Sequence, residues 1–358
     1  MKILLFGEYT TNGFMILGYY QRGFEALGHE VLFFPMTTTT DGLGQTSNNA
    51  IQGLKNTYPF RIIRRALKRV DTIAAPLRAN SLVSKAISIV DEFKPDVALT
   101  SQGGKSVAWP PALLQALNEK GIPIYNYFTD PVPENDKKFL ATIPFYAGIF
   151  TYNRHYVPTW YWYGARRVDY IPFGSDHTLH VPKRPSRERF EHYYSPISYL
   201  ATWQPDAERW PSVLVPYDLK IWGNNWFKLP AGHELRSFWQ GQEQGLYREF
   251  PLICSASDIV FNVIRAFNGQ GHSMKTFEIP ACKGFAITNR TEQQLEFFPE
   301  DKACVYFSTV EELIEKIEFY LKNEKAREKI VEQAYQIAIK HRYLDRARDM
   351  VRIFKKFV

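Results

Sequence analysis

A lysine and a glutamate three positions apart, Lys275 and Glu278, stand near the start of a helix that the apolar spacing predicts from Ser273. Ser273 is a typical N-cap residue, and residues three apart share one face of a helix. Backbone N–H groups at a helix start, together with a lysine on the first turn, can bind phosphate. A carboxylate one turn further on can accept two hydrogen bonds from ribose hydroxyls. The segment therefore predicts a site for a phosphate group and a ribose.

The same helix has a second interpretation, which stays open at this point. An ordinary surface helix with an ion pair between Lys275 and Glu278 would show the same spacing. Pro280 cannot donate a hydrogen bond to the carbonyl of Thr276, so the helix is expected to be short or kinked.

Three other polar side chains, Glu8, Asp130 and His272, are candidates for a catalytic or sugar-binding role. Glu8 lies in a loop bounded by Gly7 and Gly13, where the backbone can approach a ligand closely. Asp130 follows the end of a predicted strand, and His272 directly precedes the predicted helix. Each has a structural alternative. Glu8 could belong to a plain strand–helix turn, Asp130 could be a turn or N-cap aspartate, and His272 could be a loop histidine without a role.

These side chains are carried by strands and helices that alternate along the chain. In the first half we expect elements at 2–6, 14–27, 30–34, 81–93, 96–100, 110–117, 122–128, 148–152 and 168–172. In the second half we expect them at 197–201, 207–215, 219–222, 258–263, 285–288 and 324–339, with helices starting after 273 and 309. Alternation is typical of parallel sheets, which bind ligands at the carboxyl ends of their strands. The expected fold class is α/β, with two facing Rossmann-like domains and a cleft between them.

Composition divides the chain further. Residues 174–196 are rich in Pro, His, Arg and Ser and show little periodicity, which predicts a linker. We expect an N-terminal domain at 1–175, a linker at 176–196, a C-terminal domain at 197–341 and a terminal helix at 342–358. That helix carries an apolar stripe, so we expect it to pack back toward the N-terminal domain.

The charge balance points to anionic partners. The chain has 358 residues with 44 lysines and arginines against 37 acidic residues, a net charge of +7. Such a protein favours phosphates, nucleic acids or anionic membranes. The basic residues Arg61, Arg64, Arg65, Lys68 and Arg69 interleave with apolar residues at 61–70. This predicted amphipathic helix could rest on an anionic membrane or bind a polyanionic acceptor, and a solvated surface helix is the structural alternative.

Other classes are disfavoured. No apolar run approaches the roughly 18 residues that would cross a bilayer, and the first residues predict a strand rather than a signal peptide. Three scattered cysteines do not suggest a disulfide framework or a metal site. No Gly-x-Gly-x-x-Gly motif follows the first strand, which disfavours an oxidoreductase. We expect a soluble cytoplasmic protein, with peripheral membrane contact as an open alternative.

Several segments of the second half resemble GT-B glycosyltransferases, and most of all the CgeB-like and glycosyltransferase family 4 group. The resemblance is carried by Ser273-Met274-Lys275-Thr276-Phe277-Glu278-Ile279-Pro280-Ala281-Cys282-Lys283-Gly284, Phe307-Ser308-Thr309-Val310-Glu311-Glu312-Leu313, Leu219-Lys220-Ile221-Trp222-Gly223-Asn224-Asn225-Trp226 and Ser257-Asp258-Ile259-Val260-Phe261-Asn262. It covers most of residues 197–348 and, more thinly, the first 175 residues. It implies that the domain at 1–175 is the acceptor side and that the domain at 197–341 binds the nucleotide sugar.

The resemblance implies that Glu278 holds the donor ribose, that Lys275 faces the donor diphosphate and that Arg209 is a second phosphate-binding residue. The other donor-site residues that we expect with it are Gln270, Gly271, Ser273, Thr276, Trp222 and Gly223. Two positions depart from the family pattern: Gln270 stands where a paired glutamate is usual, and Lys283 is inserted where Cys-Gly is usual.

The activity that the resemblance implies is that of a hexosyl- or pentosyltransferase, which moves a sugar from a UDP-, GDP- or related sugar to a hydroxyl. Lys275, Arg209 and the helix start would neutralise the departing diphosphate, so we expect no metal and no other cofactor. The expected acceptor is a glycan, a small molecule or a lipid-linked intermediate. A nucleic acid base as acceptor, and a non-catalytic nucleotide-sugar or glycan-binding protein, are the alternatives.

Overall fold

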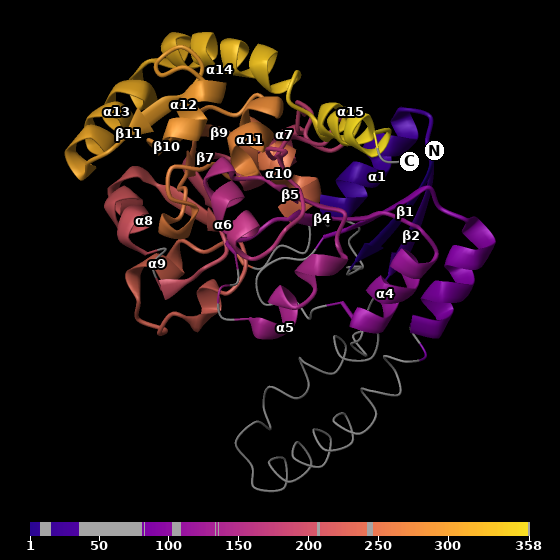
Figure 1. Cartoon of the computed structure of the whole chain (residues 1–358). Helices are drawn as coiled ribbons and strands as arrows, with labels where there is room; N and C mark the ends of the chain where they lie inside the picture. Colours follow the sequence, from indigo (N-terminus) through magenta and orange to yellow (C-terminus); the bar gives the residue numbers. More distant parts are fainter. Residues whose placement is uncertain are drawn as a thin grey trace, which may run out of the picture.

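The computed structural model describes residues 1–7, 16–35, 81, 83–101, 109–132, 134, 136–205, 208–241 and 246–356. Structural statements below concern these residues. Two of the predictions, for Glu8 and for the basic helix at 61–70, lie outside them. Figure 1 shows the described chain as two α/β halves side by side.

The first half is built on a parallel sheet with the strand order β2-β1-β3-β4-β5-β6. Its strands are β1 Lys2–Gly7, β2 Glu30–Pro35, β3 Val97–Thr100, β4 Ile124–Phe128, β5 Gly148–Thr151 and β6 Val168–Tyr170. Its helices are α1 Ile16–Ala26, α4 Pro111–Glu119, α5 Lys137–Leu140, α6 Val157–Trp162 and a further helix at 83–93. The neighbouring strands β3, β4 and β5 are buried at every residue, and their sequences are mostly apolar, as is typical of strands covered on both faces.

The second half is built on a parallel sheet with the order β11-β10-β9-β7-β8. Its strands are β7 Ser195–Leu200, β8 Leu219–Trp222, β9 Ser257–Asn262, β10 Ala286–Asn289 and β11 Val305–Phe307. Its helices are α7 Arg187–Tyr193, α8 Arg209–Leu214, α9 Glu234–Ser237, α10 Leu246–Ser255, α11 Lys275–Ala281, α12 Glu292–Phe297, α13 Val310–Lys322 and α14 Glu324–Ala338. Two parallel sheets covered by helices confirm the predicted fold class.

Local sequence explains where several helices begin and end. Gly28 follows α1 with φ of 79°, a conformation that glycine adopts without strain. The hydroxyl of Thr309 accepts a hydrogen bond of 3.1 Å from the amide of Glu312, as the predicted capping box requires. The Glu312 carboxylate completes the motif one residue earlier than expected, because it accepts from the amide of Ser308 at 2.7 Å.

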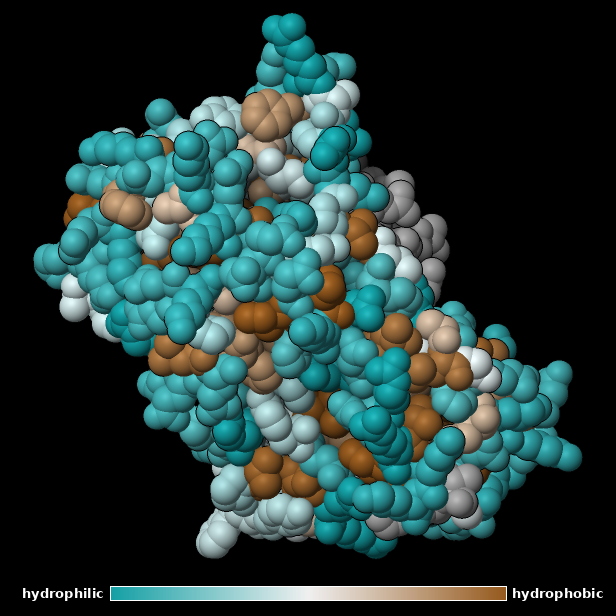
Figure 2. All heavy atoms as spheres, turned by 90° about the horizontal axis from the view of Figure 1, so that it is seen from above, coloured by the Kyte–Doolittle hydropathy of each residue, from teal (hydrophilic) through white to brown (hydrophobic). Residues whose placement is uncertain are grey.

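The last helix, α15 Tyr343–Phe354, leaves the second half and packs on α1 of the first (Figure 1). A Cβ atom at Gly23 would lie 3.0 Å from the Ala347 Cβ, so the two helices approach closely there. The Phe354 ring lies 6.1 Å from the Phe24 ring, between centroids. Seen from above in Figure 2, the face that carries α14 and α15 is mostly hydrophilic, with apolar groups separated from one another. The apolar stripe of the terminal helix is thus buried, as predicted.

The segment between the two sheets is more ordered than the linker that its composition predicts. Ser175 pairs with Arg342 in a parallel bridge: its amide donates to the His341 carbonyl at 3.1 Å, and its carbonyl accepts from the Tyr343 amide at 2.8 Å. The segment also ends in α7, which Ser186 caps by accepting from the Arg189 amide at 3.4 Å. Backbone pairing with the α14–α15 junction therefore fixes the segment between the two sheets in place.

One hydrophobic core extends across both halves. It joins α1 and one face of the first sheet to α11, α14 and α15, through Tyr20, Tyr127, Phe277, Ala334 and Met350 among others. Separate cores fill the opposite face of the first sheet and the two faces of the second. The shared core fixes the carboxyl ends of the two sheets relative to each other.

Candidate active site

Helix α11 is buried, not exposed as in the surface-helix interpretation of this segment. Every residue from Thr276 to Ala281 is buried. Phe277 belongs to the core shared by both halves, whereas Ile279 belongs to a core of the second sheet. The helix has seven residues, in agreement with the short helix that Pro280 predicts.

The helix begins later than expected. It starts at Lys275 with Met274 as the flanking residue, so Ser273 is not the N-cap. The amide of Ser273 instead donates to the Thr276 hydroxyl at 3.2 Å, and the Thr276 hydroxyl donates to Oε1 of Gln294 at 3.2 Å. The N-cap prediction was wrong because the chain adds a tight turn before the helix, in which the Thr276 amide donates to the Ser273 carbonyl.

Lys275 and Glu278 lie three positions apart on α11, and the charge of each acts on the pKa of the other. Burial lowers the pKa of the half-buried Lys275, the Glu278 carboxylate raises it, and Arg265 lowers it further. Burial raises the pKa of Glu278 to about 7, with Lys275 acting to lower it and Asp176 to raise it. A cation and a carboxylate are therefore held in a poorly solvated place, where an anionic or hydroxylated ligand gains most from them.

Arg265 completes this group, although it is not among the residues predicted for the donor site. It follows β9, and its Nη2 donates to the carbonyl of Thr202, after β7, at 2.8 Å. Its charge acts on the pKa values of both Lys275 and Asp130, so it faces both halves. Its position directly after a predicted central strand is the signal that could have identified it.

Asp130 lies opposite, two residues after the end of β4. Burial raises the pKa of its half-buried carboxyl, and Arg265 lowers it. Among the described residues, no donor lies within hydrogen-bond distance of its carboxylate. The N-cap of the nearby α5 is Asp136, whose carboxylate accepts from the Phe139 amide at 3.0 Å. An ionisable group without a capping role thus lies within the influence of Arg265 of the second half.

His272 is fully buried, which removes it from contact with a ligand in this structure. Its Nε2 accepts from the Phe173 amide at 3.1 Å, so Nδ1 carries the proton and donates to Oε1 of Gln293 at 3.0 Å. Burial lowers its pKa to about 3, although Gln293 acts to raise it. The amide of Gln293 also donates to Oδ1 of Asn153, in the first half, at 2.7 Å. His272 therefore joins the two halves, and a role in proton transfer does not fit its position.

The neighbouring loop residues are similarly engaged in structure. Oε1 of Gln270 accepts from the Glu292 amide at 3.2 Å, at the start of α12. A Cβ atom at Gly271 would lie 2.5 Å from Nδ2 of Asn153, so only glycine fits where the halves meet. Lys283 lies beyond the other end of α11 and forms an ion pair of 2.8 Å with Glu332, which directs it away from Lys275.

Three of the residues predicted for the donor site, Arg209, Trp222 and Gly223, lie in different surroundings. Arg209 begins α8, is exposed, and holds its guanidinium 4.9 Å from the ring centroid of Trp210. Trp222 is fully buried in a core of the second sheet, so it offers no surface to a ligand. Gly223 has φ of 137°, and a Cβ there would lie 2.1 Å from the Ala201 carbonyl oxygen, after β7. Only Gly223 of these three lies next to the central strand ends.

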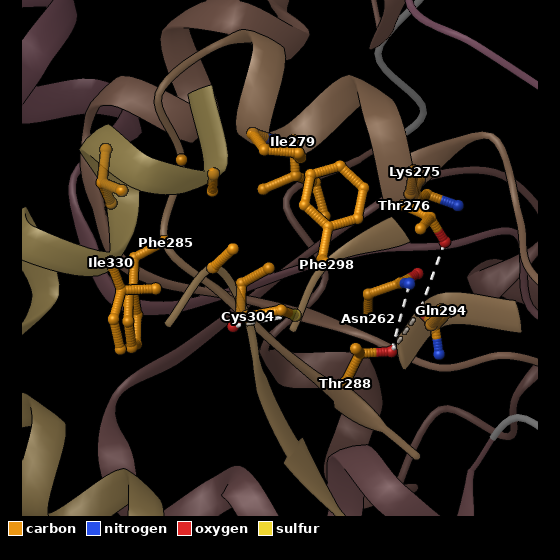
Figure 3. A pocket seen from close by; sticks show the side chains of 16 residues that line it. Asn262, Lys275, Thr276, Ile279, Phe285, Thr288, Gln294, Phe298, Cys304 and Ile330 are labelled. Carbon is orange, nitrogen blue, oxygen red and sulfur yellow. Dashed lines mark hydrogen bonds between the residues drawn. The ribbon is translucent and has the colours of Figure 1, made fainter. Parts of the chain in front are cut away.

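A small cavity extends behind Lys275 between α11, α12, α14 and the second sheet (Figure 3). One end is polar: Nδ2 of Asn262 donates to Oγ1 of Thr288 at 3.3 Å, and Gln294 lies next to both. The other end is lined by apolar residues, including Phe285, Phe298 and Ile330. The polar groups are paired with one another, so they hold the carboxyl ends of β9 and β10 in place.

No three His, Cys, Asp or Glu side chains in the described ranges are grouped as a metal site would require. None of the helices in the part of the chain described here combines the length and apolar character needed to span a bilayer.

Several known proteins resemble this chain. Residues 203–352 match the family described as glycosyl transferase-like, whereas no curated protein matches the chain. Similar solved structures include a glycosyltransferase from Rickettsia africae, with 14% identity, a TM-score of 0.59 and coverage of 99% of this chain and 98% of that one. Sucrose-phosphate synthase from Thermosynechococcus elongatus has 11% identity, a TM-score of 0.61 and the same coverage.

A third similar structure is HepE from Anabaena in complex with UDP-glucose, with 12% identity, a TM-score of 0.61 and coverage of 99% of this chain and 100% of that one. At these identities the likeness concerns the fold alone. The predicted likeness to the CgeB-like and family 4 group stays a prediction. The chain has the fold of the GT-B glycosyltransferases, and its residues 203–352 match the glycosyl transferase-like family.

Proposed function

We propose that this protein is a glycosyltransferase that uses a nucleotide-diphosphate sugar and binds its donor on the second half. The observation that carries the proposal is that Arg265, which joins the carboxyl ends of β9 and β7, acts on the pKa of Lys275, while Lys275 and Glu278 act on each other's pKa. Lys275 and Arg265 would neutralise the diphosphate as it leaves, and Glu278 would accept the ribose hydroxyls. The complexes of HepE with UDP and UDP-glucose make a UDP-sugar the first donor to test.

Proton removal from the acceptor hydroxyl is assigned to Asp130 in this proposal. It faces the donor cations from the first half, and burial raises the pKa of its carboxyl toward the range in which a general base works best. The acceptor would enter from that side. A glycan, a small molecule or a lipid-linked intermediate fits a hydroxyl acceptor, and no observation favours a nucleic acid base.

A binding experiment with matched variants tests the donor site. Isothermal titration with UDP and UDP-glucose is expected to give 10- to 100-fold weaker binding for Lys275→Ala and for Glu278→Gln, as for the loss of a charged hydrogen bond of about 1.5–3 kcal/mol. Lys283→Ala is the control, because this lysine lies at the opposite end of the same helix. Unchanged affinity in both site variants would remove the proposed donor site.

Metal independence is a separate part of the proposal. Two side-chain cations would take the role that a divalent metal plays in metal-dependent transferases. Turnover is therefore expected to survive EDTA, and its loss on chelation, with recovery on adding Mg²⁺ or Mn²⁺, would contradict this part alone.

All three cysteines are buried free thiols, which supports a reducing, cytoplasmic setting for the reaction.

A further inference from the structure

His180 lies where the two halves meet, on the segment between the sheets. It is 4% exposed. Its ring packs edge-on against Tyr19 of α1, with 5.7 Å between centroids, and edge-on against Phe250 of α10, with 5.6 Å. An imidazole held between aromatic rings of both halves has little freedom to turn, so its nitrogen atoms have fixed neighbours.

One hydrogen bond sets the position of its proton. The amide of Asp176 donates to Nδ1 of His180 at 2.8 Å, so Nδ1 is an acceptor and the neutral ring carries its proton on Nε2. That nitrogen lies 3.6 Å from Oε1 of Glu278. Burial lowers the pKa of His180 to about 4, although Asp176 acts to raise it, so the ring is neutral near pH 7. The protonated Nε2 therefore lies near the Glu278 carboxyl group without adding a charge.

The residue that fixes His180 is itself anchored to the first half. Asp176 is fully buried and forms an ion pair of 2.7 Å with Arg22 of α1. Its Oδ1 accepts from the amide and hydroxyl of Thr178, at 2.9 and 2.6 Å, and from the Leu179 amide at 2.9 Å. These bonds outweigh burial and hold the pKa of Asp176 below its usual range. The loop that carries His180 is thus held in place by the Asp176 carboxylate, both oxygens of which accept hydrogen bonds.

We propose that His180 is a positioning residue for donor recognition: it orients the Glu278 carboxylate toward the donor ribose, while the Arg22–Asp176 pair holds His180 in place. This inference rests on the proposed function, because it assigns a partner to the proposed ribose-binding glutamate. The separation of 3.6 Å is slightly longer than a hydrogen bond, and such contacts shorten when the ligand binds. The first half would then influence donor binding without touching the nucleotide.

Two amide variants separate this role from a purely structural one. In His180→Asn the side-chain amide can still reach the Asp176 amide but not Glu278. In His180→Gln the longer side chain can place an N–H near the former Nε2 position. The probes are UDP and 2′,3′-dideoxy-UDP, and the readout is the ratio of their dissociation constants, which isolates the part of the affinity that depends on the ribose hydroxyls.

The wild-type ratio is expected to be about tenfold or more, because charged hydrogen bonds to the hydroxyls are lost in the analogue. His180→Asn is expected to reduce the ratio at least fivefold with unchanged affinity for dideoxy-UDP, and His180→Gln to restore most of it. An unchanged ratio in His180→Asn would overturn the positioning role, as would an equal reduction in both variants. If wild type binds neither probe, the proposed donor site fails, and this inference fails with it.

Discussion

Nη2 of Arg265 donates a hydrogen bond of 2.8 Å to the carbonyl of Thr202. The first residue follows β9 and the second follows β7, the neighbouring central strands of the second sheet. The chain places β8 on one side of β7 and then returns to place β9 on the other. Ligands of open α/β sheets bind where the winding direction changes in this way. A guanidinium fixed at that point is well placed to meet an anionic donor.

Replacing Arg265 with alanine is therefore expected to raise the dissociation constant for UDP about 10- to 100-fold, as for the loss of a charge-assisted contact. Arg209→Ala is the matched comparison, because Arg209 is exposed and stacked on Trp210. It is expected to change the affinity less than threefold. Isothermal titration distinguishes the two, and a larger effect of Arg209 would restore the assignment that the family resemblance favours.

Glu278 should make folding stability depend on pH. Its folded-state pKa is about 7, above the ordinary 4.5, so the fold favours the protonated form. The stabilisation is fully present below pH 4.5 and is lost as the pH rises through 7. The groups that face Glu278 are Lys275, Asp176 and His180.

Between pH 4.5 and pH 8, wild type should lose on the order of 3 kcal/mol of unfolding free energy relative to Glu278→Gln, which cannot ionise. Urea unfolding of both proteins at the two pH values measures this difference. Parallel pH profiles of the two proteins would show that the glutamate is solvated like an ordinary surface carboxylate.

Much of the fold could be predicted because its strands are short apolar runs between Gly, Pro and polar residues. The strand predicted at 219–222 coincides with β8, and the terminal helix docks as its apolar stripe requires. Helix α7 was missed because its sequence, Arg-Glu-Arg-Phe-Glu-His-Tyr, is polar and follows two prolines. Composition indicated a linker there, whereas the Ser186 cap starts a helix.

The site could be predicted only where its residues share one short segment. Lys275 and Glu278 are three positions apart, so helical spacing brings them together without any knowledge of packing. The other residues come close to this pair only through the folded structure. Strand order places Arg265, an ion pair to α1 places Asp176, and the buried segment between the two sheets places His180. His272 was misjudged for the same reason: a loop position in the sequence does not reveal that both halves close over it.

His272 should affect stability. Its replacement by phenylalanine leaves the buried Phe173 amide without its acceptor, which should cost about 1–3 kcal/mol. Oε1 of Gln293 loses one of two donors but still accepts from the Tyr170 hydroxyl at 3.2 Å. Thermal unfolding of this variant should shift downward by several degrees. His155→Ala, at an exposed histidine, should unfold like wild type. A stable His272→Phe protein with reduced turnover would instead support a catalytic histidine.

Gly271 tests the contact between the halves. Alanine there would bring its Cβ to 2.5 Å from Nδ2 of Asn153 and 2.8 Å from the Asn268 carbonyl oxygen. Since a Cβ does not approach atoms so closely, the loop must move, at a cost of about 1–3 kcal/mol. Gly232→Ala is the control, because a Cβ at Gly232 meets nothing within 4 Å. Equal urea midpoints for the two variants would mean that the loop can move to accept the alanine at no measurable cost in stability.

Asp130 should affect turnover rather than donor binding. Asparagine at this position keeps the size of the side chain but cannot accept a proton, so kcat is expected to fall about 10²- to 10⁴-fold. The dissociation constant for UDP should stay within threefold of wild type, because the carboxylate faces the donor from the acceptor side. Asp136→Asn, in the same loop, retains an N-cap side chain and should leave both quantities unchanged.

Burial raises the pKa of Asp130, so the wild-type kcat should fall with decreasing pH, and the midpoint of this fall should lie above the ordinary pKa range of aspartate. Asp130→Asn should not show this fall. Initial rates across pH 4–8 provide the profile. If Asp130→Asn kept the wild-type kcat and its acidic limb, the proton would have to be taken by another group, and this carboxylate would serve only to balance the charge of Arg265.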